Sequence, residues 1–422
     1  MWILYDLAFL VFSLFSLPRL LRRQWLKTLP ERLGRLPSSV SQPSSRPRLW
    51  LHAVSLGEAL AARPLIERLR REFPETQLLF STTTLTGRSA MERFRKPDEP
   101  LFYFPFDLGL ITRRVLRQIR PTLFVTMETE LWPNLFLELR RQGVPAVVVN
   151  GRLSGRSFRN YRRIRLLLRS PLEAVHLFCM QTQEDASRIE SLGISRERIE
   201  VVGNMKFDAF RSQTPVDLEA LRRRLGLTEK DFLWVAGSTH RGEEGEILEA
   251  FRRLRESYPA LRLLLAPRHP ERSQEVARLS GQKNLESFLV SALDSRLGPA
   301  SPPVLILDTV GELSQLYRLA TVVFIGGSLV PHGGQNLLEP AFFARPILFG
   351  PHMENFKDIT AIFLKHQAAC QVRDRSELVE ILQQLLEKEE KRHAMGERAR
   401  RLIEEQQGAT ERTVIHLRRL VR

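Results

Sequence analysis

Two segments of the sequence carry carboxylates that could act as a general base. Glu58 ends the turn SLGE after an apolar run, and Glu128 and Glu130 lie two residues apart in the segment METELWPN. A carboxylate held at the end of a strand can take a proton from a bound hydroxyl group. Each also has a structural interpretation, because Glu58 suits the first turn of a helix and Glu130 could cap the helix that follows. We expect Glu128 to act on the substrate.

A metal site is the other interpretation of the Glu128 and Glu130 pair. Their E-x-E spacing resembles the D-x-D of metal-dependent transferases. The chain contains no D-x-D and no cluster of histidines at metal-binding spacing. The sequence therefore predicts chemistry without a metal.

A glycine-rich stretch, GGSLVPHGGQNLLEP over residues 326–340, could bind a nucleotide. Its four glycines allow tight turns and close approach to a ligand. We expect a helix to begin at Asn336, a good N-cap residue, and to direct its free N–H groups at a phosphate. Glu339 could accept hydrogen bonds from sugar hydroxyls. A plain turn between a strand and a helix is equally compatible, because the stretch is neither G-x-G-x-x-G nor a P-loop.

Three basic features could contact an anionic group. Lys206 lies in the hinge-like segment GNMKFD, and Arg268 directly follows an apolar strand. Lys206 could equally be an ordinary surface lysine. The third feature is the segment GRLSGRSFRNYRRIRLLLR, residues 151–169, which has seven arginines and no acid. Phe158 and Tyr161 interleave with the arginines, which suits nucleic acid, although an anionic lipid surface fits as well.

These residues follow strands in a regular alternation of strands and helices. In the first half we expect strands over residues 48–54, 78–81, 122–126 and 146–150, and helices over 59–73, 112–119 and 131–142. In the second half we expect strands over 232–236, 261–266, 304–307, 321–325 and 346–349, with a helix over 336–344. This alternation predicts parallel α/β sheets with helices on both faces, which bind ligands at the carboxyl ends of the strands.

The composition is that of an ordinary globular protein apart from a net charge of +16 over 422 residues. The length allows two domains, and the charge points to a nucleic acid, a membrane surface or a phosphorylated substrate. The two cysteines, Cys179 and Cys370, lie in apolar surroundings, which fits a reducing cytoplasm.

The N-terminus predicts a membrane anchor. Residues 2–17 are nearly all apolar, with Asp6 as their one charge, and four basic residues follow before residue 28. Those positive charges predict that the rest of the chain stays cytoplasmic. A buried first helix is the alternative, because the run is shorter than the ~20 residues of a spanning helix. We expect an anchor over 1–18, a basic linker over 19–47, domains over 48–205 and 206–400, and a C-terminal helix over 401–422.

The layout suggests a GT-B fold, in which two Rossmann-like domains face a cleft, and a series of motifs then identifies a family. The motifs are HAVSLGE (52–58), METELWPN (127–134), GRLSGRS (151–157), GNMKFD (203–208), STHRGEE (238–244), LAPRHPER (265–272), DTVGEL (308–313), GGSLVPHGGQNLLEP (326–340) and GPHMENFKD (350–358). Over nearly its whole length, the chain resembles the bacterial transferases of 3-deoxy-D-manno-octulosonic acid (Kdo) to lipid A.

The resemblance implies an inverting transfer of Kdo from CMP-Kdo to a tetra-acylated lipid A precursor (lipid IVA), without a metal or other cofactor. Glu58 would be the general base, and Glu128 and Lys206 would stabilise the transition state. The CMP-binding residues would be Pro267, Arg268, Val310, Gly311, Glu312, Asn336, Leu337, Leu338 and Glu339. The partners would be these substrates and anionic lipid on the cytoplasmic face of the inner membrane, with no nucleic acid.

Two alternatives remain at this stage. A different GT-B enzyme could use a UDP- or GDP-sugar, and binding of CMP but not UDP or GDP would exclude it. A basic, membrane-tethered nucleic-acid-binding protein would instead show steep, salt-dependent DNA affinity.

Overall fold

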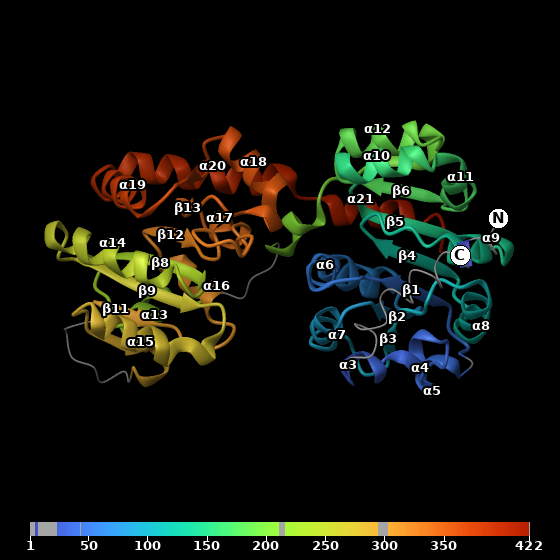
Figure 1. Ribbon diagram of the computed structural model, residues 1–422, viewed down its shortest axis with the longest axis horizontal. Helices are drawn as coiled ribbons and strands as arrows, with labels where there is room; N and C mark the ends of the chain where they lie inside the picture. The colour runs from blue at the N-terminus through green and yellow to red at the C-terminus, as the bar shows by residue number, and fades with distance from the viewer. Residues whose placement is uncertain (1–4, 7–22, 43, 211–215, 294–302, 422) are drawn as a thin grey trace. The chain divides into compact units, whose positions relative to one another are not determined.

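The computed structural model describes residues 5–6, 23–42, 44–210, 216–293 and 303–421 (Figure 1). It consists of two compact units, Met1–Arg211 with Gln406–Arg422, and Ser212–Glu405. Each unit is built around its own parallel sheet. This is a GT-B-like two-domain α/β fold, which confirms the fold class predicted from the sequence.

The sheet of the first unit has the doubly wound order β3-β2-β1-β4-β5-β6-β7. Its described strands are β1 (Arg48–His52), β2 (Gln77–Thr82), β3 (Leu101–Tyr103), β4 (Leu123–Met127), β5 (Ala146–Gly151), β6 (Leu177–Met180) and β7 (Ile199–Val201). The strand order reverses between β1 and β4, which pair directly. Glu58 and Glu128 lie just after these two strands, at the position where ligands bind in such sheets.

Helices cover both faces of this sheet (Figure 1). They are α6 (Leu56–Glu72), α7 (Leu85–Glu92), α8 (Gly109–Ile119), α9 (Pro133–Arg141), α10 (Gly155–Arg163), α11 (Arg165–Glu173), α12 (Gln183–Ser191), η1 (Arg196–Arg198), η2 (Met205–Phe210) and α21 (Ala409–Leu417). Alternate residues of a strand point to opposite faces. Leu49 and Leu51 therefore join the core beneath α6, α7 and α21, whereas Trp50 joins the core beneath α8 and α9.

The segment before β1 is packed rather than extended as a linker. It contains α3 (Arg23–Leu26), α4 (Leu29–Arg32) and α5 (Ser38–Ser41), and the side chains of Arg32 and Val40 are buried. Val40 belongs to the core of the first unit. In the part that the structure describes, the segment predicted as a basic linker over 19–47 thus contains short helices and buried side chains.

The predicted anchor over 1–18 lies outside the described residues, apart from Tyr5 and Asp6. Asp6 accepts a hydrogen bond from the side-chain amide of Asn134 at 2.7 Å. Within the described part of the chain, every helix is too short or too polar to cross a membrane.

The sheet of the second unit has the order β10-β11-β9-β8-β12-β13-β14. Its described strands are β8 (Phe232–Thr239), β9 (Leu261–Pro267), β10 (Ser287–Leu289), β11 (Val304–Ile306), β12 (Val322–Ile325), β13 (Ile347–Phe349) and β14 (Cys370–Gln371). The glycine-rich stretch follows β12, which pairs with β8 at the reversal of strand order. Its position is therefore equivalent to that of the Glu58 and Glu128 loops in the first unit.

The helices of the second unit are α13 (Leu218–Arg224), α14 (Glu244–Ser257), η3 (Pro270–Arg272), α15 (Ser273–Gln282), η4 (Val290–Ala292), α16 (Leu313–Leu316), η5 (Tyr317–Leu319), α17 (Leu338–Phe342), η6 (Glu354–Phe356), α18 (Lys357–Lys365), α19 (Arg375–Glu387) and α20 (Glu389–Gln406). α14 and α19 bury their apolar faces with Trp234 and Leu263 of the central strands.

The chain returns to the first unit after α20. Gly408 adopts a left-handed conformation, with φ of 102°, which turns the chain into α21. The carboxylate of Asp208 accepts hydrogen bonds from the amides of Gly408 and Thr410, each at 2.6 Å. Ala409 and Val414 are fully buried in the core of the first unit.

Candidate functional site

Glu58 is held in the first turn of α6 by reciprocal capping. Ser55 is the N-cap residue, and its hydroxyl oxygen accepts from the amide of Glu58. The carboxylate of Glu58 accepts from the amide of Val54 at 2.8 Å and from the Ser55 hydroxyl at 3.0 Å. These contacts fix the carboxylate at the carboxyl end of β1, so its capping and catalytic interpretations are compatible.

Burial raises the pKa of Glu58 to about 8, because only 7% of the residue is exposed. The negative charges of Glu128 and Glu130 raise this pKa further, and the Val54 and Ser55 hydrogen bonds lower it. Burial, together with the charge of Glu128, also raises the pKa of Glu130. The structure therefore brings the two acidic segments predicted from the sequence into one electrostatic cluster.

Glu128 has a strained backbone. Its φ of 54° lies in the left-handed region, which glycine prefers, and its amide donates to the Val149 carbonyl at 2.9 Å. This conformation turns the chain sharply at the end of β4. A non-glycine residue at such a position indicates that its side chain is needed there.

Glu130 does not cap the helix that follows it, which corrects one expectation. Asp107 does so instead, because its carboxylate accepts from the amides of Asn134 at 3.1 Å and Leu135 at 2.8 Å. Asp107 lies between β3 and α8, 27 residues before Asn134, so local spacing gave no signal for this contact. Burial raises the pKa of Asp107 to about 7.

Several buried polar atoms line the carboxyl end of this sheet without a hydrogen-bond partner among the described residues. They are His52 Nε2, Thr82 Oγ1, Thr83 Oγ1, Thr126 Oγ1 and Trp132 Nε1. His52 stacks on Phe104 with 3.8 Å between ring centroids, and burial lowers its pKa to about 3. A buried polar atom without a partner is costly, so this edge of the sheet is suited to a polar ligand or to water.

The backbone of Lys206 lies beside the same sheet. Its backbone amide donates to Asn204 Oδ1 at 3.0 Å, and the amide of Met205 donates to Asn150 Oδ1 at 2.9 Å. Asn150 lies in the last two residues of β5, is fully buried and, like Glu128, has a positive φ. Within the described chain the ammonium group of Lys206 forms no ion pair, so its charge is available to a ligand.

The glycine-rich stretch of the second unit turns through positive φ angles. Gly327, Gly333 and Gly334 have φ of 66°, 84° and 72°. A Cβ atom on Gly326 would lie 2.4 Å from the carbonyl oxygen of Ser238, which leaves no room for a side chain. The four glycines are therefore required by backbone conformation and by close packing.

Glu243 organises this stretch and was not recognised in the sequence. Its buried carboxylate accepts from the amides of Gly327, Ser328 and Leu329, and also from the amide of His240 at 2.7 Å. Burial raises its pKa to about 7, although these hydrogen bonds oppose the shift. The only sequence signal was its position in STHRGEE, which reads equally well as an ordinary acidic helix start.

The helix expected over 336–344 is shorter than predicted. α17 spans five residues and begins at Leu338, whose amide donates to Asn336 Oδ1 at 3.1 Å. Asn336 therefore forms a local side-chain turn instead of capping the helix, and a helix of this length presents little dipole to a phosphate. The side-chain amide of Asn336 donates to the Glu339 carboxylate at 3.4 Å, and burial raises the pKa of Glu339.

The other predicted nucleotide contacts also lie at strand ends of the second unit. Pro267 is the last residue of β9, and Arg268 after it is exposed. Val310 and Gly311 lie in the loop after β11, where 79% of Val310 is exposed and Gly311 has a φ of 93°. Glu312 pairs with Arg224 at 2.6 Å, and this arginine lowers its pKa. Leu337 and Leu338 are buried, so only their backbone could face a ligand.

Three histidines join these loops, although the sequence gave them no shared role. The rings of His240 and His332 stack with 4.3 Å between centroids, and His269 lies edge-on to His240 at 6.1 Å. Burial and the neighbouring positive groups lower the pKa of His240 to about 4, so it is neutral at pH 7. Gln335 approaches His240 at 3.2 Å.

Two other observations bound the chemistry. Within the described residues, no group of three or more histidine, cysteine, aspartate or glutamate side chains could hold a metal ion.

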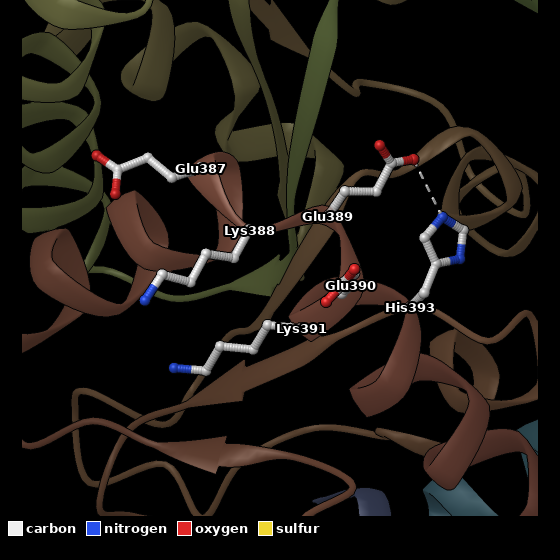
Figure 2. A pocket seen from close by; sticks show the side chains of 6 residues that line it. All are labelled: Glu387, Lys388, Glu389, Glu390, Lys391 and His393. Atoms are coloured by element: carbon white, nitrogen blue, oxygen red, sulfur yellow. Dashed lines mark ion pairs between the residues drawn. The ribbon is translucent and has the colours of Figure 1, made fainter.

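A surface hollow of about 690 Å³ between α19 and α20 is lined by Glu387, Lys388, Glu389, Glu390, Lys391 and His393 (Figure 2). Its exposed charges of both signs, including the pair of His393 and Glu389 at 3.4 Å, are typical of solvated helix ends.

Residues 27–209 match the family model described as "3-Deoxy-D-manno-octulosonic-acid transferase (kdotransferase)". A 3-deoxy-D-manno-octulosonic acid transferase of Haemophilus influenzae is 33% identical, over 92% of this chain and 90% of its own. The transferase of the same name from Bordetella pertussis is 35% identical, over 93% and 91%. A solved UDP-GlcNAc 2-epimerase from Neisseria meningitidis is 14% identical and covers 88% of this chain and 100% of its own with a TM-score of 0.57, which shows a common fold.

Proposed function

The chain belongs to the 3-deoxy-D-manno-octulosonic acid (Kdo) transferase family, as a glycosyltransferase of lipopolysaccharide synthesis, and from this premise we propose that it transfers Kdo from CMP-Kdo to a lipid A precursor, lipid IVA, with Glu58 as the general base. The observation that carries the proposal is the buried Glu58 carboxylate at the carboxyl end of β1. Its pKa of about 8 is close to physiological pH, where a general base is most effective.

In the proposed reaction, the Glu58 carboxylate takes the proton from a primary sugar hydroxyl of the acceptor. The hydroxyl oxygen forms a bond to the anomeric carbon of Kdo while the bond from that carbon to the phosphate oxygen of CMP breaks. The electron pair of the broken bond leaves with CMP, and attack from the opposite side inverts the anomeric configuration. This step requires no metal, because a side chain supplies the base and a fixed cation can offset the charge of the leaving phosphate.

Lys206 and Glu128 support this step in different ways. The ammonium group of Lys206 has no carboxylate partner within 4.0 Å in the described chain, so it can offset charge on the leaving phosphate. Glu128 contributes a negative charge beside Glu58 that raises the pKa of the base and strengthens it as a proton acceptor. We place the CMP moiety on the strand-end loops of the second unit, at Arg268, residues 310–312 and residues 336–339.

The acceptor is a lipid, and the arginine-rich segment of the first unit suits the surface of an anionic membrane. α10 has no buried residue, and the chain then exposes Ile164, Leu166 and Leu167 by 45%, 77% and 51%. Exposed leucines beside a dense positive charge are typical of a surface that rests in a lipid headgroup layer. We propose that this surface holds the enzyme on the cytoplasmic face of the inner membrane.

Liposome flotation tests this membrane proposal. Changing Arg159, Arg162 and Arg163 to glutamate should release the protein from vesicles that contain anionic lipid, whereas the same change at the three arginines of α8 should not. Equal binding by both triple variants would refute it.

Mass spectrometry of the lipid product tests the proposed reaction. After incubation with CMP-Kdo and lipid IVA, the wild type and the Glu67→Gln control should add the mass of Kdo, and Glu58→Gln should add none. Glu67 lies on the same helix and pairs with Arg63 on the surface, at 2.9 Å. Transfer by Glu58→Gln at the wild-type rate would remove Glu58 as the base and leave Glu128 as the next candidate.

Thermal stabilisation tests the donor independently. CMP should raise the melting temperature, and UDP and GDP at the same concentration should not. The reverse pattern would favour a different nucleotide-sugar and would refute the CMP-Kdo donor.

A further inference from the structure

A small cavity lies beside the loop that follows β2. It has a volume of about 200 Å³ and is lined by Trp25, Thr28, Arg32, Thr83, Thr84, Leu85 and Thr86. Sites for whole small molecules usually occupy about 300–1,000 Å³. This cavity is therefore suited to one substituent of a larger substrate rather than to a complete sugar.

Arg32 is the one charged side chain among these lining residues, and only 3% of the residue is exposed. Its Nε donates to Thr28 Oγ1 at 2.9 Å and its Nη2 donates to the Thr83 carbonyl at 2.5 Å. The guanidinium carbon lies 4.3 Å from the ring centroid of Trp25. Burial lowers its pKa to about 10, so the group stays positive at neutral pH.

Arg32 forms no ion pair within the described chain, although the nearby negative charge of Glu31 raises its pKa. No carboxylate there lies within 4.0 Å of the guanidinium, and the neighbouring Glu31 pairs with Arg88 at 3.3 Å instead. Nη1 also donates to no atom among the described residues, although it belongs to a residue that lines the cavity. A buried cation without a counter-charge is costly, because contacts with aromatic faces offset only part of its desolvation. The missing counter-charge therefore points to an anion in the cavity.

Hydroxyl groups complete the lining. Thr83 Oγ1 is buried and has no hydrogen-bond partner among the described residues. Nη1 of Arg32 donates to no atom among the described residues either, and an apolar ligand would satisfy neither of these two donors. An oxyanion accepts from both kinds of donor at once.

The cavity is joined directly to the loop that holds the base. The amides of Thr83 and Thr84 donate to the Val54 carbonyl at 3.2 and 3.1 Å, and the Thr84 hydroxyl donates to the same oxygen at 3.1 Å. The amide of Val54 in turn donates to the Glu58 carboxylate at 2.8 Å. A single residue thus separates the cavity wall from the base.

We propose that this cavity binds an oxyanion substituent of the acceptor, a phosphate group of the lipid A precursor, and so places a nearby hydroxyl at Glu58. The proposal rests on the proposed function for the identity of the acceptor. Arg32 and Thr83 are then positioning residues, since they hold the acceptor rather than the reacting atoms.

Direct binding is tested with inorganic phosphate and the full-length protein. Trp25 lies against Arg32, so its fluorescence should change with phosphate in a saturable way. The change should be lost in Trp25→Phe and in Arg32→Met and kept in Arg35→Met, which alters an exposed arginine three residues away. The site is overturned if the phosphate response persists in Arg32→Met. It is also overturned if the wild type shows no response that is lost in Trp25→Phe.

The role of the site in catalysis is tested with two acceptors that differ only in the phosphate group nearest the accepting hydroxyl. For the wild type, removing this phosphate should lower kcat/KM on the order of 10- to 100-fold, mostly through KM, as expected for charge-assisted hydrogen bonds. Arg32→Met should show a similar loss with the phosphorylated acceptor and little further loss without the phosphate. An equal effect of Arg32→Met on both acceptors would show a merely structural role and overturn the proposal.

Two milder variants guard against a folding defect. Arg32→Lys keeps the charge and should restore part of the discrimination between the acceptors, and Thr83→Val keeps the side-chain volume and should reduce it. If neither lipid accepts Kdo but the Arg32-dependent phosphate response remains, the proposed acceptor fails and the oxyanion site stands. If both lipids accept Kdo equally well, the reaction stands and the site fails.

Discussion

The Ser55→Ala substitution should move the pH dependence of the reaction towards alkaline pH. In the wild type, the Ser55 hydroxyl donates to the Glu58 carboxylate at 3.0 Å and so favours its charged form. A hydrogen bond to a charged group contributes about 1.5–3 kcal/mol, and one pH unit in a pKa corresponds to about 1.4 kcal/mol. Removing the hydroxyl should therefore raise the pKa of Glu58 from about 8 by roughly one to two units.

The expected change in rate follows from the fraction of Glu58 that is deprotonated. At pH 7 the wild-type base is about one-tenth deprotonated, and kcat/KM should rise with pH until it levels off above pH 8. In Ser55→Ala, kcat/KM at pH 7 should fall on the order of 10- to 100-fold, and the difference from the wild type should shrink as the pH rises beyond 9. The assay is a pH series of initial rates at low acceptor concentration.

The control for this experiment is Thr182→Ala. Thr182 is the N-cap of α12 in the same unit, and its hydroxyl accepts from the amide of Asp185 at 3.1 Å. Both substitutions remove a cap worth about 1 kcal/mol of stability, but only Ser55→Ala touches the base. If Ser55→Ala lowered kcat/KM by the same factor at every pH, or moved the profile towards acid, the assignment of Glu58 as the base would be wrong.

Four further predictions concern stability and donor binding. Because the folded-state pKa of Glu58 is raised, the stability of the wild type falls as the pH rises from about 4.5 to 8. Glu58→Gln should therefore gain unfolding free energy relative to the wild type over that range, as measured by denaturant titration. Glu243→Gln loses an acceptor for backbone amides, so it should lower the unfolding free energy by about 1–3 kcal/mol and weaken CMP binding measured by calorimetry. Glu246→Gln, at an exposed position of α14, should change neither quantity. Asp107→Ala uncaps α9 and should lower the unfolding free energy by about 1–2 kcal/mol, and an unchanged melting temperature would contradict this role. Gly333→Ala, at a φ of 84°, should destabilise the glycine-rich stretch by about 1 kcal/mol or more in the same assay.

Regular alternation made the sheets predictable from the sequence. A strand buried on both faces reads as an apolar run, as in residues 146–150, where every residue of β5 is buried. β3, β10 and β14 were not predicted, because they have only two or three residues and leave almost no periodic signal. The helix expected from Asn336 was wrong because a good N-cap residue also forms side-chain turns, and composition does not decide between the two.

The candidate site was predictable where the contacts that hold a side chain are local in sequence. The capped position of Glu58 could be predicted, because Val54 and Ser55, which hold its carboxylate, lie within four residues of it. Asp107 and Glu243 could not, because the amides that Asp107 binds, and three of the four that Glu243 binds, are 27 or more residues away in sequence. The buried charge of Arg32 was also invisible, since its segment read as a linker and only tertiary packing buries it.

The return of the chain to the first unit through α21 makes the second unit an insertion in the first. Residues 212–405 are contiguous and can be produced as one fragment, whereas a fragment that ends near residue 211 lacks the helix that covers α6. Such a truncated fragment would expose the core beside Ala59 and Leu65 and should aggregate unless residues 406–422 are joined to it by a short linker or supplied as a peptide. The chain crosses between the two units twice, near residues 211 and 405. Cleavage at one crossing would leave the units joined through the other. The two parts of the first unit would then be held together by noncovalent contacts.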